Sequence, residues 1–308
     1  MNIIIWGAGN YGRSAYLNLN KYVEICGIFD SDKERIGEDF YGQNINDIHN
    51  LPDNYDVILM CAANWESMYV LAKEIGIDDD KLYIWDGKTR IKKEEAYAAK
   101  VHSQDGEELF LREQFRDVRS GFYVDVGAYH PLKYSNTLWA YNLGWKGINI
   151  EPNTDNFHLF NLMRPNDINI NAGISNSRSK MKYYQFDEAA LNTFDKDRAT
   201  MLCDKYDYKL TNCVDVDVLP LQDILDQYNI THIDYMDIDV EGKELEVLKS
   251  INYDRVQIQY LLIEQLQSDL KSVLNSEIAG FLEIYGFSPV SKFDRTVIYH
   301  NNGVKNVF

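Results

Sequence analysis

The stretch that decides the fold runs from Phe122 to Pro152, FYVDVGAYHPLKYSNTLWAYNLGWKGINIEP. Its first residues, Phe122 to Val126, form the short apolar, β-branched run that is typical of a buried parallel strand. Gly127 follows where the chain must turn tightly, and we expect a helix from near Ser135. Trp145 to Ile150 predicts the next strand. The stretch therefore predicts strand, glycine turn, helix and strand in unbroken order, as in a nucleotide-binding fold.

Glu151 lies at the carboxyl end of this second expected strand. Open α/β sheets bind their ligands at that edge, where a carboxylate can accept hydrogen bonds from both hydroxyls of a ribose. The competing interpretation is a solvated acid or a helix cap. We predict Glu151 to be a nucleotide-binding residue.

A second glycine-rich turn lies near the start of the chain. The apolar run Ile3 to Trp6 is followed by GAGNYG at 7–12, which matches G-x-G-x-x-G between a strand and a helix. The next expected strand, Val23 to Phe29, ends in an acid where dinucleotide folds bind a ribose. Only about half of a full dinucleotide fold is visible, so the ligand stays open, and a glycine turn kept for close helix packing is the alternative. The predicted nucleotide-type loop consists of Gly7, Gly9, Gly12 and Asp30.

The sequence predicts two α/β domains. Residues 1–88 form the smaller, Rossmann-like one, and the strongly charged residues 89–106 are expected to form a helical connector. In residues 107–308 the alternation of strands and helices continues, with strands expected at 167–174, 233–238 and 260–263. Two last runs, 287–291 and 296–300, predict a C-terminal antiparallel hairpin.

Composition narrows the class of protein. The 308 residues carry a net charge of −17, which makes nucleic acid an improbable partner because such binding depends on Lys and Arg. No apolar run approaches the roughly 18 residues of a membrane span. The N-terminus shows no signal-peptide pattern, and the four cysteines show no C-x-x-C spacing. We expect a cytoplasmic protein with reduced thiols; whether it forms a homo-oligomer is left open.

From about Glu107 onward the chain resembles the FkbM family of S-adenosylmethionine (SAM)-dependent methyltransferases. The resemblance is specific because several motifs occur together and in order. It rests on VDVGAYHP at 124–131, YSNT at 134–137, GWKGINI at 144–150, LNTF at 191–194, DIDVEG at 237–242, LEVLK at 245–249 and LIE at 262–264.

The resemblance implies an α/β fold with the Rossmann-like sheet of a class I methyltransferase. It also implies that SAM binds over the first two strands and that a hydroxyl is methylated, often on a sugar. One departure from the family pattern is His130-Pro131, where many methyltransferases have a second glycine. The residues that the resemblance assigns to the cofactor cleft are Asp125, Gly127, Ser135, Asn136, Glu151 and Asp239.

Methylation of a neutral hydroxyl needs a group that removes its proton. Asp239 is the first candidate because it stands at a strand end, and His130 is the second because an imidazole titrates near neutral pH. Asp237 projects to the same face as Asp239 and is the third. Alternatively, Asp237 or Asp239 together with Glu264 could bind Mg²⁺, which prefers oxygen ligands.

Residues 181–218 interrupt the regular pattern and are rich in aromatic side chains. They could cover the cleft and stack on a sugar ring, or they could simply pack an edge hairpin. The favoured function is SAM-dependent O-methylation of a saccharide or glycan precursor in surface polysaccharide biosynthesis. The alternatives are an NAD-dependent sugar oxidoreductase or epimerase driven by the first domain, and a binding module without catalysis.

Overall fold

The computed structural model describes residues 1–98, 100–266 and 269–303. The chain divides into two compact units, Met1–Lys100 and Val101–Phe308. The point of division lies inside the charged stretch that was expected to be a connector. Among the described residues, no helix combines the length and the apolar character needed to cross a bilayer.

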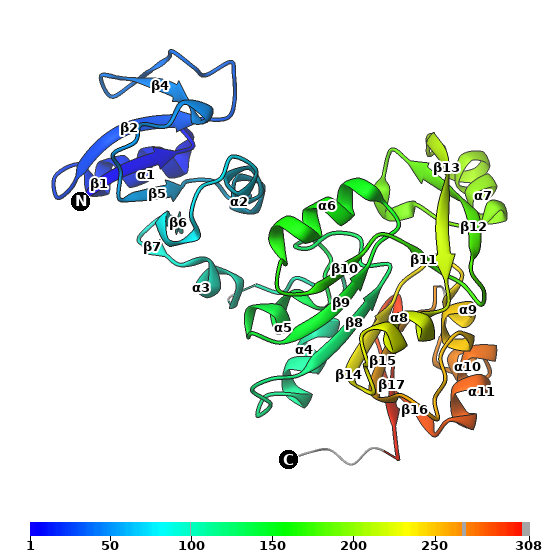
Figure 1. Ribbon diagram of the computed structural model, residues 1–308. Helices are drawn as coiled ribbons and strands as arrows, with labels where there is room; N and C mark the ends of the chain where they lie inside the picture. The colour runs from blue at the N-terminus through cyan, green and yellow to red at the C-terminus, as the bar shows by residue number, and fades with distance from the viewer. Residues whose placement is uncertain (99, 267–268, 304–308) are drawn as a thin grey trace. The chain divides into compact units, whose positions relative to one another are not determined.

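The first unit contains one seven-stranded sheet in the order β3-β4-β2-β1-β5-β6-β7 (Figure 1). The central strands are parallel, and the short β3 and β7 join its two edges in antiparallel pairing. The parallel part includes β4, a strand that we did not predict. The elements are β1 (Asn2–Trp6), α1 (Asn10–Leu19), β2 (Glu24–Asp30), β3 (Asp39–Phe40), β4 (Gln43–Asp47), β5 (Val57–Met60), α2 (Trp65–Glu74), β6 (Leu82–Trp85), β7 (Arg90–Ile91) and α3 (Lys93–Ala98), with 3-10 turns at Ile48–Asn50 and Asp79–Lys81.

Part of the expected connector belongs to this first sheet. Strand β7 pairs with β6, and helix α3 packs against β6. Lys93 forms an ion pair with Asp79 and donates a hydrogen bond to the hydroxyl of Tyr69, both in the same unit. The high charge of this stretch therefore reflects an outer face of the first unit rather than a free linker.

The second unit is built on a seven-stranded sheet in the order β10-β9-β8-β14-β15-β17-β16. Strands β10, β9, β8, β14 and β15 are parallel, whereas β17 runs antiparallel to both of its neighbours. The expected C-terminal hairpin is thus confirmed. The elements are α4 (Glu107–Gln114), β8 (Phe122–Val126), α5 (Leu138–Asn142), β9 (Lys146–Ile150), α6 (Thr154–Met163), β10 (Ile168–Ile170), α8 (Leu221–Gln227), β14 (His232–Ile238), α9 (Glu244–Lys249), β15 (Gln257–Glu264), α10 (Leu270–Leu274), α11 (Glu277–Ile284), β16 (Phe287–Lys292) and β17 (Thr296–Asn301).

A smaller three-stranded sheet interrupts this pattern, in the order β11-β13-β12. The single strand expected at 167–174 is wrong, because the chain leaves the main sheet after Ile170 and Gly173–Ile174 pairs with β13 instead. The elements of this part are β11 (Gly173–Ile174), β12 (Ser179–Phe186), a 3-10 turn at Ala189–Leu191, α7 (Lys196–Tyr206) and β13 (Leu210–Leu219).

Two cores hold the main sheet of the second unit in place. One is aliphatic and includes Val124, Ile148 and Ile238, all of them fully or almost fully buried. The other is aromatic and includes Tyr123, Trp145 and Tyr235. Burying such side chains is the main favourable term in folding, and it fixes the strand ends that carry the polar residues discussed next.

Candidate active site

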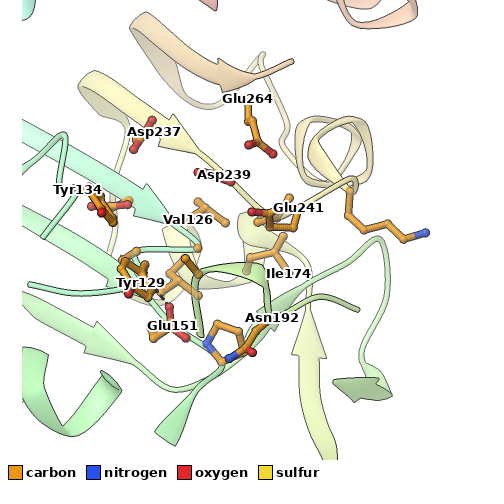
Figure 2. Close-up of a pocket in the computed structure, with 18 of the residues that line it drawn as sticks. Val126, Tyr129, Tyr134, Glu151, Ile174, Asn192, Asp237, Asp239, Glu241 and Glu264 are labelled. Carbon is orange, nitrogen blue, oxygen red and sulfur yellow. Dashed lines mark hydrogen bonds between the residues drawn. The ribbon is translucent and has the colours of Figure 1, made fainter. Parts of the chain in front are cut away.

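A deep cavity opens at the carboxyl ends of β8, β9, β14 and β15, the edge at which parallel α/β sheets bind ligands. Figure 2 shows Glu151, Tyr129 and Asn192 on one side of it and Asp237, Asp239 and Glu264 on the other. Its lining includes Gln104, Glu107, Asp125, Gly127, Tyr129, Tyr134, Asn136, Glu151, Ala172, Gly173, Tyr183, Asn192, Phe194, Asp237, Asp239, Glu241, Lys243, Glu264, Arg295 and Thr296.

The bend at Gly127 is packed against two neighbouring strands. Its N–H and that of Ala128 both donate to the carbonyl of Ile150, at 3.0 and 3.1 Å. Gly127 has φ = 81°, and a Cβ added there would lie 1.8 Å from the carbonyl oxygen of Asp239. Only glycine fits this bend, because both the backbone conformation and the space exclude a side chain.

Glu151 lies at the floor of the cavity and is only 4% exposed. Its Oε2 accepts the N–H of Tyr129 at 2.8 Å and its Oε1 accepts the N–H of Asn153 at 2.7 Å. Burial raises the pKa of this carboxyl to about 8. Each oxygen keeps a further lone pair, so the side chain can still accept hydrogen bonds from a ligand.

The wall beside Glu151 comes from the chain that leaves the main sheet. Ala172 and Gly173 line it, and the ring of Phe194 fills the space over Gly173 that a Cβ would need. Tyr183 packs against Phe194 with ring centroids 4.7 Å apart. Of the aromatic insertion, Tyr183 and Phe194 thus line the cavity, whereas Tyr206 and Tyr208 are exposed to solvent and do not.

The opposite end of the cavity is lined mainly by carboxylates. The backbone of Asp239 donates to the carbonyl of Val126 at 3.0 Å, so Asp239 lies directly beyond the Gly127 bend. Asp237 is buried, and its Oδ2 accepts a hydrogen bond from the Asn136 amide at 3.0 Å. The Oδ1 of Asn136 is buried and has no partner. This end therefore presents hydrogen-bond acceptors to a ligand.

Burial shifts the titration of these acids upward. The carboxylate of Asp239 is accessible from the cavity but enclosed by protein, which raises its pKa to about 7, and nearby Glu244 adds to the shift. Burial, and then the charge of Asp239, raise the pKa of Glu264 to about 9. The pKa of Asp237 is raised well above its ordinary value by burial and by Asp125. Near neutral pH the carboxyl groups at this end of the cavity therefore retain some of their protons.

Sequence reasoning missed Arg164, the residue that organises the loop between β8 and α5. Arg164 is completely buried and donates to Thr137 Oγ1 and to Ser135 Oγ, both at 2.7 Å, and to the carbonyl of Pro131. Thr137 in turn donates to Asp125 at 2.6 Å. Because Arg164 simply follows the end of α6, no local pattern marks it.

Two predicted site residues do not line the cavity. The hydroxyl oxygen of Ser135 accepts hydrogen bonds from Arg164 and from the N–H of Leu138, so it stabilises the loop between β8 and α5. The Nδ1 of His130 accepts the N–H groups of Leu132 and Lys133, at 3.0 and 3.2 Å. Burial lowers the pKa of His130 to about 4, and its acceptor nitrogen is occupied, so the structure contradicts a role for His130 as the base.

The other predicted residues of this site are brought together. Asp125, Gly127, Asn136, Glu151, Asp237, Asp239 and Glu264 all line the one cavity. The oxygens of Asp239, Glu241 and Glu264 lie within 4.8 Å of one another, which is compatible with a cation. However, Glu241 forms an ion pair with Arg198. We therefore assign no metal ion to these residues.

Backbone strain is concentrated around the same cavity. Among the described non-glycine residues with positive φ, Tyr129, Tyr134 and Glu241 all line it, with φ between 53° and 55°. A bulky residue in this conformation costs of the order of 1–3 kcal/mol, and such residues cluster at functional sites. The rings of Tyr129 and Tyr134 are nearly parallel, with centroids 6.2 Å apart, and Tyr134 is 56% exposed.

The glycine loop of the first unit has a different construction. A Cβ at Gly12 would lie 2.0 Å from the carbonyl oxygen of Gly7, so Gly12 is required for close packing of α1 on β1. At Gly9 the nearest atom to a Cβ would be an Arg35 nitrogen at 3.9 Å, so packing does not require this glycine. Asp30 accepts the N–H of Ala8 at 2.8 Å. The nucleotide ligand of this loop stays a prediction.

The strand order, the closing hairpin and the cavity at the carboxyl edge define an α/β domain of the class I methyltransferase type. The model of the methyltransferase FkbM domain matches residues 125–289. The chain belongs to this family and is a methyltransferase. A second family model, C2185-like N-terminal, matches residues 1–83. Among curated proteins, no sequence matches the chain.

The solved structures that are similar to the chain include a precorrin methyltransferase and a candidate RNA methyltransferase. The precorrin-6y C5,15-methyltransferase of Geobacter metallireducens GS-15 is 12% identical, with a TM-score of 0.34, over 66% of this chain and 93% of that one. A candidate RNA methyltransferase from Pyrococcus horikoshii is 11% identical, with a TM-score of 0.32, over 64% of this chain and 81% of that one. Both TM-scores are low, so the strand order and not these likenesses defines the fold.

Proposed function

We propose that the protein transfers the methyl group of SAM to a hydroxyl of a saccharide or glycan precursor, in the assembly of a surface polysaccharide. The observation that carries the proposal is the continuity of the cavity. It extends from Glu151 along the Gly127 bend to Asp239. A nucleoside site and a proton acceptor thus share one enclosed space.

The residues of this chain fit SAM. The carboxyl group of Glu151 can accept hydrogen bonds from the hydroxyls of a ribose. Ala172, Gly173 and Phe194 form an apolar wall next to it, which suits an adenine ring. Because Gly127 has no side chain, the bend packs directly against the carbonyl of Asp239. SAM supplies an electrophilic methyl group on a sulfonium.

The chain itself would bind, orient and deprotonate the acceptor. Asp239 lies beyond the Gly127 bend and is accessible from the cavity, so it can accept the proton of a hydroxyl there. Asp237 and Asn136 are linked by a hydrogen bond and supply further acceptor atoms for neighbouring hydroxyls. Much of the rate should come from holding the acceptor oxygen in line with the methyl group.

Two features support a saccharide as the acceptor. The acid-lined end offers hydrogen-bond acceptors, which suits a ligand with many hydroxyl donors. The exposed ring of Tyr134 at the same cavity can pack against the apolar face of a sugar ring.

Calorimetry with SAM and S-adenosylhomocysteine tests the cofactor site. Glu151→Gln keeps the size of the side chain but replaces one acceptor oxygen with an NH2 donor. We expect it to weaken binding of both ligands by about 10- to 100-fold, because one ribose hydroxyl is left without its acceptor in a buried site. The matched control is Asp30→Asn, the equivalent strand-end acid of the first unit, which should leave this binding unchanged.

Undiminished binding by Glu151→Gln would remove the assigned site. The acceptor class is tested separately, by measuring S-adenosylhomocysteine formation with a panel of methyl glycosides and nucleotide sugars. Turnover confined to compounds without a sugar ring would contradict the saccharide part of the proposal.

A further inference from the structure

Asp239 and Glu264 form a close pair of carboxyl groups at the carboxyl ends of two adjacent parallel strands. Ile238, the last residue of β14, pairs with Ile263 of β15, so Asp239 directly after β14 lies beside Glu264, the last residue of β15. Their carboxylate oxygens lie within 4.8 Å of each other. Glu264 is only 8% exposed, and Figure 2 shows it pointing toward Asp239 inside the cavity. Two like charges at this separation are costly when buried.

The surroundings supply more negative than positive charge. Arg198 is engaged with Glu241, and Lys243 donates to Glu246 at 2.9 Å, so both are partly neutralised by other acids. Arg295 is the remaining cation that lines the cavity among the described residues. The charged groups that face the pair are Glu107, Asp125, Asp237, Glu241, Glu244, Arg198, Lys243 and Arg295.

The pair therefore favours retaining one proton. Burial and then the charge of Glu244 raise the pKa of Asp239 to about 7, although a hydrogen bond with Glu264 lowers it. Burial and then the charge of Asp239 raise the pKa of Glu264 to about 9. Because the two groups interact, these values describe the titration of the pair as a whole. Between about pH 7 and pH 9 the pair carries close to one proton. An Asp239 that shares this proton is a weaker base than a free carboxylate.

The methyl donor would change this state through its charge. The carbonyl oxygen of Asp239 is the atom that a Cβ on Gly127 would strike, so a ligand seated on this bend lies beside the pair. The sulfonium of SAM is positive, whereas the thioether of S-adenosylhomocysteine is neutral. A positive charge near a carboxyl pair in an enclosed site favours its ionised form.

Building on the proposed function, we propose that Asp239 and Glu264 hold one proton between them in the free protein and that binding of SAM expels it to solvent. The base then forms only when the methyl donor is present. During transfer the oxygen–methyl bond forms and the methyl–sulfur bond breaks, with its electron pair left on sulfur. The hydroxyl proton passes to Asp239, which restores the shared proton as the sulfur becomes neutral.

The number of protons released when SAM binds tests this proposal, and the measurement needs no methyl acceptor. Titration calorimetry at pH 8, in phosphate and in Tris, gives the number of protons released from the dependence of the heat on the buffer. We expect SAM to release roughly one proton more than S-adenosylhomocysteine. Glu264→Gln removes the partner that holds the proton, so SAM should still bind while this difference falls to near zero. Asp217→Asn removes an exposed carboxylate on β13 and should leave the difference unchanged.

Equal proton release by the two ligands, or an unchanged difference in Glu264→Gln, would overturn the inference while leaving the methyltransferase site intact. Loss of the difference after EDTA treatment would assign the effect to a bound cation and would also overturn it. Failure of both ligands to bind the wild-type protein would remove the proposed function itself. If Glu264→Gln does not fold, Asp239→Asn tests the same pair with the same readout.

Discussion

The two units contain the same local arrangement, but different residues surround it in each. In each, a glycine turn follows a central parallel strand, and an acid at the end of the neighbouring strand accepts a backbone N–H of that turn. The hydrogen bond is Ala8 to Asp30 in the first unit and Tyr129 to Glu151 in the second, at 2.8 Å in both. Each unit thus contains a glycine turn whose backbone donates a hydrogen bond to an acid at a strand end.

The difference lies in what covers the turn. Asp30 is partly exposed, next to an exposed Arg35, and the cavity beside the loop is lined mainly by charged side chains such as Asp32 and Glu34. Glu151 is buried beneath residues of β11, β12 and the segment 189–194, which the second unit adds outside its main sheet. The strand, glycine and acid therefore specify the geometry of the turn. Whether the acid at the turn is enclosed depends on the segments inserted outside the main sheet.

Substitution of the glycines should give the largest contrast. Gly127→Ala places a Cβ on the carbonyl of Asp239 at positive φ, so we expect SAM affinity to fall by more than about 100-fold and stability by roughly 1–3 kcal/mol. Gly9→Ala meets no close atom and should change stability by less than about 0.5 kcal/mol. Thermal unfolding and calorimetry measure both. Normal SAM binding by Gly127→Ala would show that the Gly127 turn tolerates a side chain as well as the Gly9 turn does.

Replacing the arginine near each turn should give the next largest contrast. Arg164→Met leaves the carbonyl of Pro131 and the hydroxyls of Ser135 and Thr137 without their buried donor, so we expect a loss of about 3 kcal/mol. Arg35→Met removes an exposed ion pair with Asp32 and should cost less than about 1 kcal/mol. Urea denaturation of the full chain measures both. Equal costs would mean that the Arg164 network contributes no more than a surface ion pair.

The dependence of stability on pH should differ in sign between the units. In the second unit, Glu151 and Glu264 have pKa values raised to about 8 and about 9, against an ordinary 4.5. The folded form therefore binds more protons, and its free energy of unfolding should fall as the pH rises from about 5 to 9, by of the order of 1–4 kcal/mol. In the first unit, backbone N–H groups of His49 and Thr89 lower the pKa values of Asp47 and Asp86. That stabilisation is lost as the pH falls below about 4.

Hydrogen exchange at several pH values separates the two units in one experiment. Protection of strands β8 and β9 should decrease toward alkaline pH, beyond the trend of intrinsic exchange. Glu151→Gln should flatten this dependence. The same slope in β1 and β2 would contradict the assignment of the effect to the buried acids of the second unit.

Residues at strand ends were predictable because their placement follows from the sheet. Strand patterns and family motifs predicted that Gly127, Glu151 and Asp239 lie close together, and they line one cavity because parallel strands bring their carboxyl ends to one edge. Loop residues were less predictable. His130 and Ser135 were assigned to the site, but their orientation is set by neighbouring N–H groups and by Arg164, which lies 29 residues beyond Ser135.

The strand pattern by itself determined that this chain forms parallel α/β sheets with a closing hairpin, because apolar and β-branched runs must be buried between helices. It also determined which acids end those strands. Only the tertiary structure decided that the chain leaves the sheet after Ile170 to enclose Glu151, and that Asp239 and the buried Glu264 meet as a pair in the cavity. These features depend on contacts between segments far apart in the chain, which local sequence preferences do not specify.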